Sequence, residues 1–297
     1  MKHTKQIFAL GFFDGVHLGH QTLLAECVRL AKEQNCQAAA ITFDRHPQAL
    51  FSENPPALIS TCADREFLLR RYGIGSIYKY PVDEQTMSMP WETFLEELVA
   101  YGAVGFVCGD DFRFGYRGQG NGEKLRAFCR QRGLHCTIVP EQTVDGIRVS
   151  STYIRQQIET GDMATAVKFL GHPYYLTGTV VPGKQLGRRL GIPTANLRLP
   201  EGLTVPKFGV YACLCRIDGT AYPAVTNIGT RPTVDGQGIT VEPWILDYSG
   251  DLYGRQITLE FHYFLRPEKK FDSLEDLQGQ IRRDAGETRQ ILSESFT

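Results

Sequence analysis

The first half of the chain alternates short apolar runs with helix-length amphipathic segments, and this alternation restricts the fold more than any other feature. Strands are expected at 7–12, 38–43, 76–80, 104–108 and 135–139. Helices are expected between them, at 18–33 and near 63–72, 91–101 and 122–132. Repeated strand–helix units of this length connect by right-handed crossovers and build a parallel sheet with helices on both faces. The sequence therefore predicts a doubly wound α/β domain, in which ligands bind beyond the carboxyl ends of the strands.

The pattern changes in the second half. Residues 150–171 are helical, with a break at T-G-D (160–162). Short strands separated by Gly- and Pro-containing turns are then expected at 175–182, 208–217, 221–228, 239–247 and 256–264. Strands without intervening helices predict an antiparallel β-barrel. A long helix at about 273–292, with Asp272 or Ser273 as its N-cap, is expected to end the chain.

This change of pattern predicts two domains. The first comprises residues 1–160, a helical linker covers 161–172, and the second comprises 173–297.

Composition argues against a nucleic-acid-binding protein and against a membrane protein. The chain of 297 residues has 32 Lys and Arg against 33 Asp and Glu, unlike the basic surface of a nucleic-acid-binding protein. No apolar stretch approaches the roughly 20 residues needed to cross a bilayer. The apolar run I-F-A-L near the N-terminus is too short for a signal peptide. We therefore expect a cytoplasmic protein that binds neither nucleic acid nor membranes.

The eight cysteines include no C-x-x-C pair. Cys213 and Cys215 lie two residues apart in the expected strand V-Y-A-C-L-C-R-I, so they share one face. A zinc site is one interpretation, but no second Cys or His pair at ligand spacing accompanies them. The sequence favours buried thiols in a reducing compartment.

The segment G-F-F-D-G-V-H-L-G-H (11–20) lies between the first strand and the first helix. His17 and His20 are three residues apart at the start of that helix, so both rings can face one spot. Gly11 and Gly19 allow backbone amides to approach a phosphate, and the helix N-terminus adds partial positive charge. Two imidazoles over an α-phosphate can donate hydrogen bonds to charge that develops in a pentavalent transition state. The segment predicts a nucleotidyl-transfer site, and the alternative is a Gly-rich turn with incidental histidines.

Three later segments are expected at the same sheet edge: T-F-D-R-H-P (42–47), G-D-D-F-R-F-G (109–115) and V-S-S-T-Y-I-R (149–155). The last begins a helix, where hydroxyls, amides and a following arginine can clamp the β- and γ-phosphates of ATP, although S-S-T can also be a simple N-cap. In the middle segment Asp111, Phe112 and Phe114 could hold an isoalloxazine or adenine ring, although single aromatic residues are more often part of a core.

Together these segments resemble the nucleotidyltransferase superfamily with the H-x-G-H signature. The specific resemblance, over the whole first half, is to the FMN adenylyltransferase module of prokaryotic bifunctional riboflavin kinase/FAD synthetases. It implies that His17, His20 and Arg155 act in catalysis. The ATP contacts that we predict in this half are Gly11, Phe13, Asp14, Gly19, Ser150, Ser151 and Thr152. The sequence departs from the family at Phe12, where Asn is common, and at Tyr153, where Arg is frequent.

A second constellation begins with G-K-Q-L-G-R-R-L-G-I-P-T-A-N-L (183–197). Thr194 and Asn196 lie two residues apart, on one face of an extended segment, and offer oxygen ligands to a Mg²⁺ ion that bridges ATP phosphates. Taken alone, this segment could equally be an ordinary Gly-rich turn. The residues predicted to contact ATP are Gly183, Gly187, Arg188, Gly191 and Pro193.

Companion segments follow in order: G-V-Y-A (209–212), N-I-G-T-R-P-T (227–233), V-E-P-W-I-L-D-Y (241–248), D-L-Y-G (251–254) and F-L-R-P-E-K-K-F (264–271). This run is similar to riboflavin kinase throughout the second half. The resemblance implies that Glu242 takes the proton from the ribityl 5′-hydroxyl; without it, Glu242 would be read as a solvent-facing strand residue. The sequence departs from the family at Lys184, Gln185 and Leu186, where Asp-Lys-Arg is usual, and at Trp244, where His is usual.

The two constellations predict an enzyme that phosphorylates riboflavin to FMN and then adenylylates FMN to FAD. ATP is the expected co-substrate, Mg²⁺ the expected metal, and riboflavin, FMN and FAD the expected ligands. Two alternatives stay open: an enzyme in which only one half works, and a flavin-binding regulatory protein without turnover. The intact candidate catalytic and metal-binding residues argue against both.

Overall fold

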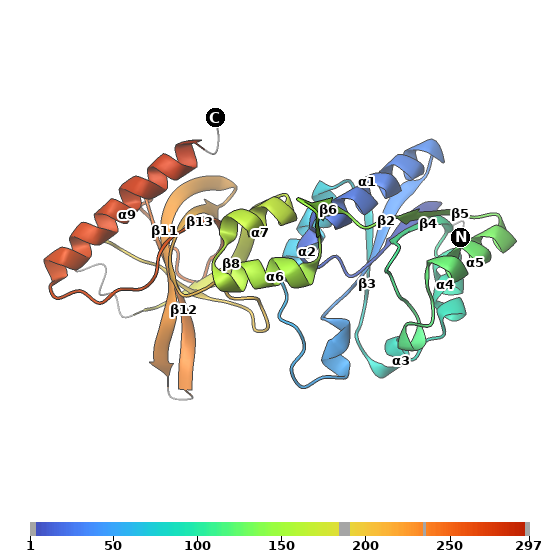
Figure 1. The fold of residues 1–297 in the computed structure, drawn as a ribbon, viewed down its shortest axis with the longest axis horizontal. Coiled ribbons are helices and arrows are strands. Elements are labelled where there is room, and N and C mark those ends of the chain that lie inside the picture. Colours follow the sequence, from blue (N-terminus) through green and yellow to red (C-terminus); the bar gives the residue numbers. More distant parts are fainter. Residues whose placement is uncertain (1–3, 184–190, 234–235, 295–297) are drawn as a thin grey trace. The chain divides into compact units, whose positions relative to one another are not determined.

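The computed structural model divides the chain into two compact units, Met1–Ser151 and Thr152–Thr297, which are described separately (Figure 1). The structure describes residues 4–183, 191–233 and 236–294.

The first unit is built on a five-stranded sheet in the order β3-β2-β1-β4-β5, and every neighbouring pair is parallel. Its strands are β1 (Gln6–Leu10), β2 (Gln37–Phe43), β3 (Ser76–Tyr80), β4 (Ala103–Gly109) and β5 (His135–Val139). The chain runs outward from β1 to β3 and then returns past β1 to β4 and β5. This reversal confirms the predicted doubly wound sheet, and it creates a switch point between β1 and β4.

Helices cover both faces of this sheet (Figure 1). They are α1 (Leu18–Glu33), α2 (Cys62–Arg71), α3 (Glu84–Met87), α4 (Trp91–Ala100) and α5 (Gly122–Arg132). On one face Phe94 and Leu98 of α4 and Phe128 of α5 share a hydrophobic core with Phe106 of β4. On the other face α1 packs close enough for the Cys27 thiol to lie 3.3 Å from a β1 carbonyl. The four predicted helices are confirmed, whereas the short α3 was not predicted.

A short hairpin, β6 (Thr143–Val144) and β7 (Ile147–Arg148), follows β5. Its turn is Asp145-Gly146, and both residues have positive φ (53° and 77°), as a two-residue type I′ hairpin turn requires. The prediction missed this hairpin, although Asp-Gly between short apolar residues is its usual signal.

The boundary between the units falls after the first residue of α6 (Ser151–Thr160), and the second unit continues through α7 (Met163–Leu170) into a closed antiparallel barrel in the order β10-β11-β12-β9-β8-β13. Its strands are β8 (Tyr174–Val181), β9 (Asn196–Arg198), β10 (Gly209–Ile217), β11 (Thr220–Thr233), β12 (Gly236–Ile245) and β13 (Gln256–Arg266). The barrel confirms the predicted fold. The strand β9 was not predicted, because three residues carry too little periodicity to identify a strand.

The barrel's outer wall carries the final helix, α9 (Leu274–Glu294). Ala285 of α9 packs in a cluster with Val210 of β10 and Val225 of β11. Ser273 is the N-cap, because its Oγ accepts a hydrogen bond from the Asp276 amide at 3.1 Å. The sequence had left Asp272 and Ser273 open as caps, and the structure selects Ser273.

Cys213 and Cys215 are fully buried in β10, and burial raises the pKa of both thiols, that of Cys215 to about 12. Protonated thiols of this kind behave as small hydrophobic residues.

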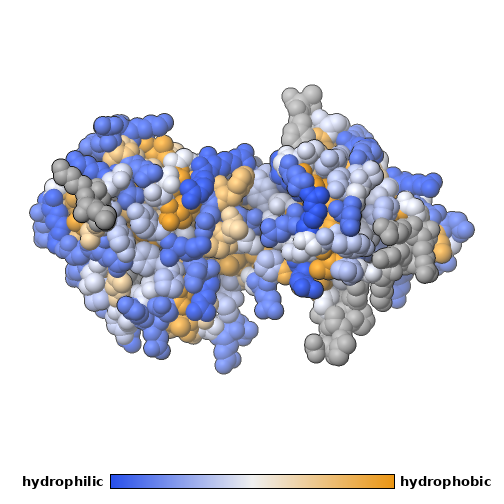
Figure 2. Space-filling view, turned by 180° about the vertical axis from the view of Figure 1, so that it is seen from behind, coloured by the Kyte–Doolittle hydropathy of each residue, from blue (hydrophilic) through white to orange (hydrophobic). Residues whose placement is uncertain are grey.

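Across the described part of the chain, no helix combines the length and apolarity needed to cross a membrane. On the face shown in Figure 2, hydrophobic residues form small patches among hydrophilic ones.

We predict that Ser273→Ala lowers the free energy of unfolding of the barrel by about 0.5–2 kcal/mol, because the substitution leaves an amide at the start of α9 without its acceptor. Urea unfolding followed by far-UV circular dichroism measures the change. The matched control is Ser293→Ala near the other end of α9, where the hydroxyl donates back to the Gln290 carbonyl and caps no amide at the start of the helix. Equal losses for the two variants would contradict the capping role.

Candidate active sites

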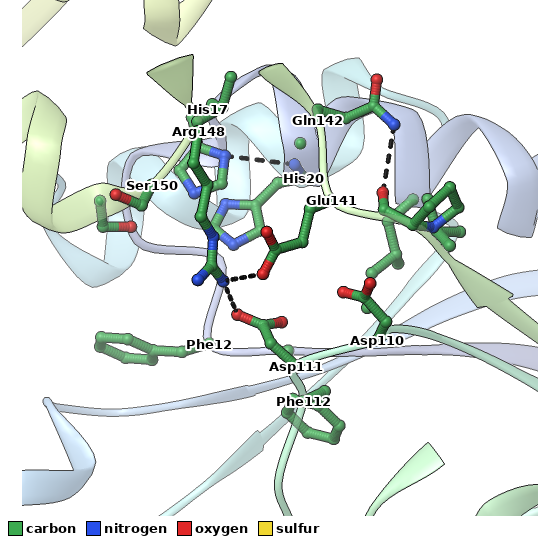
Figure 3. A pocket seen from close by; sticks show the side chains of 18 of the residues that line it. Phe12, His17, His20, Asp110, Asp111, Phe112, Glu141, Gln142, Arg148 and Ser150 are labelled. Atoms are coloured by element: carbon green, nitrogen blue, oxygen red, sulfur yellow. Dashed lines mark hydrogen bonds and ion pairs between the residues drawn. The ribbon is translucent and has the colours of Figure 1, made fainter. Parts of the chain in front are cut away.

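A polar cavity of about 240 Å³ lies at the switch point between β1 and β4, beyond the carboxyl ends of these strands (Figure 3). Four loops form its wall, including the loop after β1, the loop after β4 and the segment that leads into α6. The predicted site residues on this wall are Gly11, His17, Gly19, His20, Asp111, Phe112, Ser150 and Ser151. The structure thus brings together segments that lie far apart in the sequence.

The two histidine rings stack at the cavity wall, with centroids 3.6 Å apart and an interplanar angle of 13°. His17 is the N-cap of α1, and its Nδ1 accepts a hydrogen bond from the His20 amide at 3.3 Å. In the neutral ring the proton is therefore on Nε2, so Nε2 is the hydrogen-bond donor of this ring. Burial is the main cause that lowers the pKa of His20 well below its usual range, and the neighbouring His17 and Arg65 lower this pKa further. His20 is consequently neutral at pH 7.

The loop that carries these histidines has unusual backbone geometry. Phe13 and Val16 both have positive φ (60° and 41°), a conformation that costs free energy for residues with side chains and that clusters at functional sites. Gly11 permits this turn, because a Cβ there would lie 2.9 Å from the Phe13 ring. At Gly19 a Cβ would lie 3.3 Å from the His17 ring. The lack of a side chain at these two glycines therefore makes room for neighbouring rings. It would also allow a phosphate to approach the backbone, as the sequence predicted.

Asp14 and Phe13 are not on the cavity wall. The Asp14 carboxylate is buried and accepts hydrogen bonds from the amides of Ile59 (2.9 Å) and Ser60 (3.1 Å). The Ser60 hydroxyl accepts a bond from the Gly15 amide at 3.0 Å. This arrangement ties the histidine loop to the segment before α2, so in this structure Asp14 acts on the site by shaping the loop.

Arg148 of β7 stands at the mouth of the cavity and forms ion pairs with Asp111 and, at 2.8 Å, with Glu141 (Figure 3). All three side chains are partly exposed, so these pairs contribute little stability and can exchange for a ligand. Asp111 was predicted as a flavin contact, and the structure places its carboxylate on the wall of the histidine cavity. Sequence reasoning missed Arg148, whose signal was its place at the end of the Asp-Gly hairpin.

An apolar cavity of about 680 Å³ adjoins the polar one in the same unit. Phe12 and Phe112 line both cavities, and Phe112 stacks on Phe114 with centroids 5.8 Å apart. The other aromatic residues of this lining are Phe43, Phe51, Tyr80, Phe94 and Tyr116. The predicted ring-binding residues Phe112 and Phe114 therefore lie where a flat aromatic ring can be bound, next to the histidines.

Thr152 and Arg155 were predicted as phosphate contacts. Both lie on α6 in the second unit. Their predicted role with ATP stays a prediction.

The second unit also contains two cavities. A wide one of about 810 Å³ is lined by the predicted ATP contacts Gly191 and Pro193 and by the loop 248–253. A smaller one of about 290 Å³ lies on the outer side of the barrel wall and is lined by Glu242 and Trp244 of β12 and by Ile281 of α9. Thr194 lines both cavities. The second unit therefore repeats the arrangement of the first, with two cavities that share a wall residue.

The second unit also contains candidate residues that sequence reasoning missed. Asn227 of β11 is the cross-strand partner of Glu242, and its Nδ2 donates to Glu268 at 3.3 Å. Both Asn227 and Glu268 line the smaller cavity. Each belongs to a segment that the resemblance covered, but nothing in the spacing indicated that the two side chains meet.

The predicted metal ligands differ in their position. Thr194 lies on the wall of both cavities, whereas the Asn196 amide packs on Gly183, where a Cβ would lie 2.2 Å from Nδ2. A hydroxyl and an amide oxygen from this segment fit the preference of Mg²⁺ for oxygen ligands. Gly187 and Arg188, like Lys184, Gln185 and Leu186, lie outside the described residues.

We predict that Asp14→Ala destabilises the first unit by about 1–3 kcal/mol for each backbone amide that loses its acceptor. Thermal unfolding of the purified variant measures the effect. Asp83→Ala is a suitable control, since Asp83 is also an aspartate that accepts a backbone amide bond, from Thr86 at the start of the short helix α3, away from the histidine loop. An Asp14→Ala protein with an unchanged melting temperature and a weaker affinity for ATP would instead show a direct contact with the nucleotide.

Comparison with known proteins agrees with this geometry. The FAD synthetase family model matches residues 1–153, and the riboflavin kinase family model matches residues 170–292. A bifunctional riboflavin kinase/FMN adenylyltransferase of Listeria monocytogenes is 34% identical over 97% of this chain and 93% of its own length. Its counterpart in Haemophilus influenzae is 36% identical over 93% of this chain and 90% of its own length.

A crystal structure described as a macrolide-efflux protein from Streptococcus pneumoniae superimposes with a TM-score of 0.89 at 31% identity, covering 97% of this chain and 95% of that one. The relatives match over almost their whole length, and both family models fall on the units that contain the paired cavities. This chain belongs to the family of bifunctional riboflavin kinase/FMN adenylyltransferases.

Proposed function

We propose that this chain catalyses two ATP-dependent reactions: phosphorylation of riboflavin to FMN in the second unit, and adenylyl transfer from ATP to FMN, giving FAD and pyrophosphate, in the first. The observation that carries this proposal is the pairing of cavities. Each unit has two cavities that meet at shared wall residues, Phe12 and Phe112 in one unit and Thr194 in the other. Each pair can hold a nucleotide and a flavin with their reacting groups at the shared wall.

In the first unit the phosphates of ATP would occupy the polar cavity at the N-terminus of α1, where backbone amides and the helix dipole favour anions. The isoalloxazine ring of FMN would lie in the apolar cavity between aromatic side chains. The FMN phosphate then reaches the polar cavity past Phe12 and Phe112. Asp111 would meet the flavin only at this junction.

The chemistry at this junction is a single displacement. A phosphate oxygen of FMN bonds to the α-phosphorus of ATP, and the bond from that phosphorus to the bridging oxygen breaks, so that pyrophosphate leaves with the electron pair. His17 can donate its Nε2 proton as a hydrogen bond to the developing charge, and the neutral, stacked His20 supports the ring in that position. Neither histidine needs to form a covalent intermediate.

In the second unit the wide cavity would hold ATP, and the smaller cavity between β12 and α9 would hold riboflavin. The 5′-hydroxyl of riboflavin attacks the γ-phosphorus, its proton passes to Glu242, and ADP leaves. Glu242 lines the riboflavin side, and Thr194 borders both ligands. A carboxylate in this place is suited to act as general base.

Mg²⁺ would enter as the metal of the ATP complex and neutralise phosphate charge. Thr194 and Asn196 are the residues that we propose to hold it, with oxygen ligands of the appropriate type.

We also propose that residues 1–160 form the adenylyltransferase domain, 161–172 a linker and 173–297 the kinase domain. A cytoplasmic location is our proposal as well, and it is supported by the eight free cysteines.

We predict that His20→Ala suppresses the formation of FAD from FMN but leaves the phosphorylation of riboflavin intact, because the histidine lies in the first unit and the proposed kinase site in the second. Loss of one preorganised group of this kind costs about 10²–10³ in rate. The assay supplies riboflavin or FMN with Mg–ATP and separates FMN from FAD by chromatography. A folded variant that lost both activities would rule out two separate sites, and a wild-type protein that made neither product would rule out the proposed function.

Glu242→Gln is expected to reduce FMN formation by about 10²–10⁴-fold, because the amide retains the size of the side chain but cannot accept the proton. The affinity for riboflavin should change little, and adenylylation of FMN should be unaffected. Steady-state kinetics of each half-reaction tests this, with Glu275→Gln on α9 as the control for an exposed acidic residue of the same unit. A kinase rate within a few-fold of wild type would remove Glu242 from the mechanism.

A further inference from the structure

Arg65 of α2 is a fully buried arginine, with a relative exposure of 0%. Its guanidinium donates to the carbonyl oxygens of Phe43 at 2.7 Å and Phe12 at 3.4 Å. The guanidinium lies over the Phe12 ring, with Cζ 4.4 Å from the ring centroid. The Nε atom is buried and has no hydrogen-bond partner. Within the described ranges, no carboxylate forms an ion pair with this side chain.

A buried cation without a counter-ion is costly, because its desolvation is not offset by an opposite charge. The contacts of Arg65 do not account for that cost. The Phe12 carbonyl already accepts a hydrogen bond from the Thr42 hydroxyl at 2.8 Å, so the guanidinium is not its only donor. A charge retained at the expense of stability points to a role in function.

The position of Arg65 indicates what that role is. Phe12, which covers the guanidinium, lines both the histidine cavity and the apolar cavity, and Phe43 lines the apolar cavity. The charge therefore lies directly behind the wall that the two cavities share. It also contributes to the lowered pKa of His20, after burial and the charge of His17, so its field reaches the histidines.

In the proposed adenylyl transfer, two phosphate-bearing substrates meet at this wall. Both are anions, and their mutual repulsion opposes their approach. A positive charge fixed in a poorly solvated environment acts on them more strongly than a surface arginine, because water does not screen it.

We propose that Arg65 is a positioning residue for adenylyl transfer: it holds the strand-end carbonyls of Phe12 and Phe43 and supplies a fixed positive charge behind the point where the FMN phosphate meets ATP. This inference rests on the proposed function of the first unit. It assigns the charge to a residue on α2, outside the motifs that the sequence analysis singled out.

The test compares Arg65→Lys with Arg65→Met. Both variants lose the planar guanidinium and its paired hydrogen bonds, but only Lys keeps the charge. FAD formation is measured as kcat and KM for FMN and ATP, and binding of pyrophosphate alone is measured by calorimetry. Riboflavin kinase activity and the melting temperature report whether the protein is folded. Arg70→Met, at an exposed site on the same helix, is the matched control for removal of a positive charge.

We expect Arg65→Met to lose about 30-fold or more in kcat/KM for FAD formation, the order expected for a unit charge acting over roughly 8 Å at an effective dielectric constant of about 20. Pyrophosphate binding should weaken in parallel, and the melting temperature should stay the same or rise, since an unpaired buried charge has been removed. Arg65→Lys should recover most of the activity and the binding, and Arg70→Met should behave as wild type.

Equal losses in the Lys and Met variants, or unchanged pyrophosphate binding in Arg65→Met, would overturn the proposal in favour of a purely structural arginine. If Arg65→Met fails to fold, Arg65→Lys still decides, because a folded Lys variant without activity contradicts a role for the charge. Failure of the proposed function is a different result: the wild-type protein would then make no FAD at all, whatever the residue at position 65.

Discussion

The hydrogen bonds of the buried Asp14 carboxylate support the geometry of the first site. They tie the turn after β1 to the amides of Ile59 and Ser60. That turn contains two non-glycine residues with positive φ, Phe13 and Val16, so it needs external bonds to persist. Once the turn is held, α1 begins at the next residues, with His17 as its cap and His20 stacked on it. A carboxylate that does not line the cavity thus helps to fix where the two imidazoles lie.

The two units have unrelated folds but solve the same physical problem. A parallel sheet provides a switch point at which loops from distant parts of the chain converge, whereas a barrel provides a wall whose outer side a helix can cover. In both units a polar or open cavity meets a second cavity at shared residues. A phosphate acceptor and a donor can each be bound by a different type of surface and still react at the boundary. Binding on either side of such a boundary orients the donor and acceptor groups toward each other, and this orientation can account for much of the rate enhancement of group transfer.

Much of this could be predicted from the sequence, because the signals are local. The parallel strands follow from apolar runs, the two histidines at the start of the first helix follow from H-x-G-H, and a cap at Asp272 or Ser273 follows from their place before an amphipathic segment. Contacts between distant segments were missed. The ATP contact predicted for Asp14 stays a prediction, but its hydrogen bonds to residues 45 and 46 positions further along the chain were not foreseen. Arg65 gave no signal at all, since an exposure of 0% for an arginine in a strongly polar helix contradicts the usual expectation.

The departures from the family pattern acquire a physical meaning in this structure. At position 12 the family commonly has an amide, and here a phenyl ring covers the Arg65 guanidinium and forms part of both cavities. The phenyl ring excludes water from the guanidinium, and this strengthens the electric field of the cation in the cavities. The guanidinium can therefore act on a ligand there without touching it. At position 244 an indole lines the cavity of Glu242 and packs with the cluster under α9. Both departures change the walls around the reacting groups, whereas His17, His20, Thr194 and Glu242 are retained. The chemistry proposed for each unit therefore depends on residues that these substitutions leave in place.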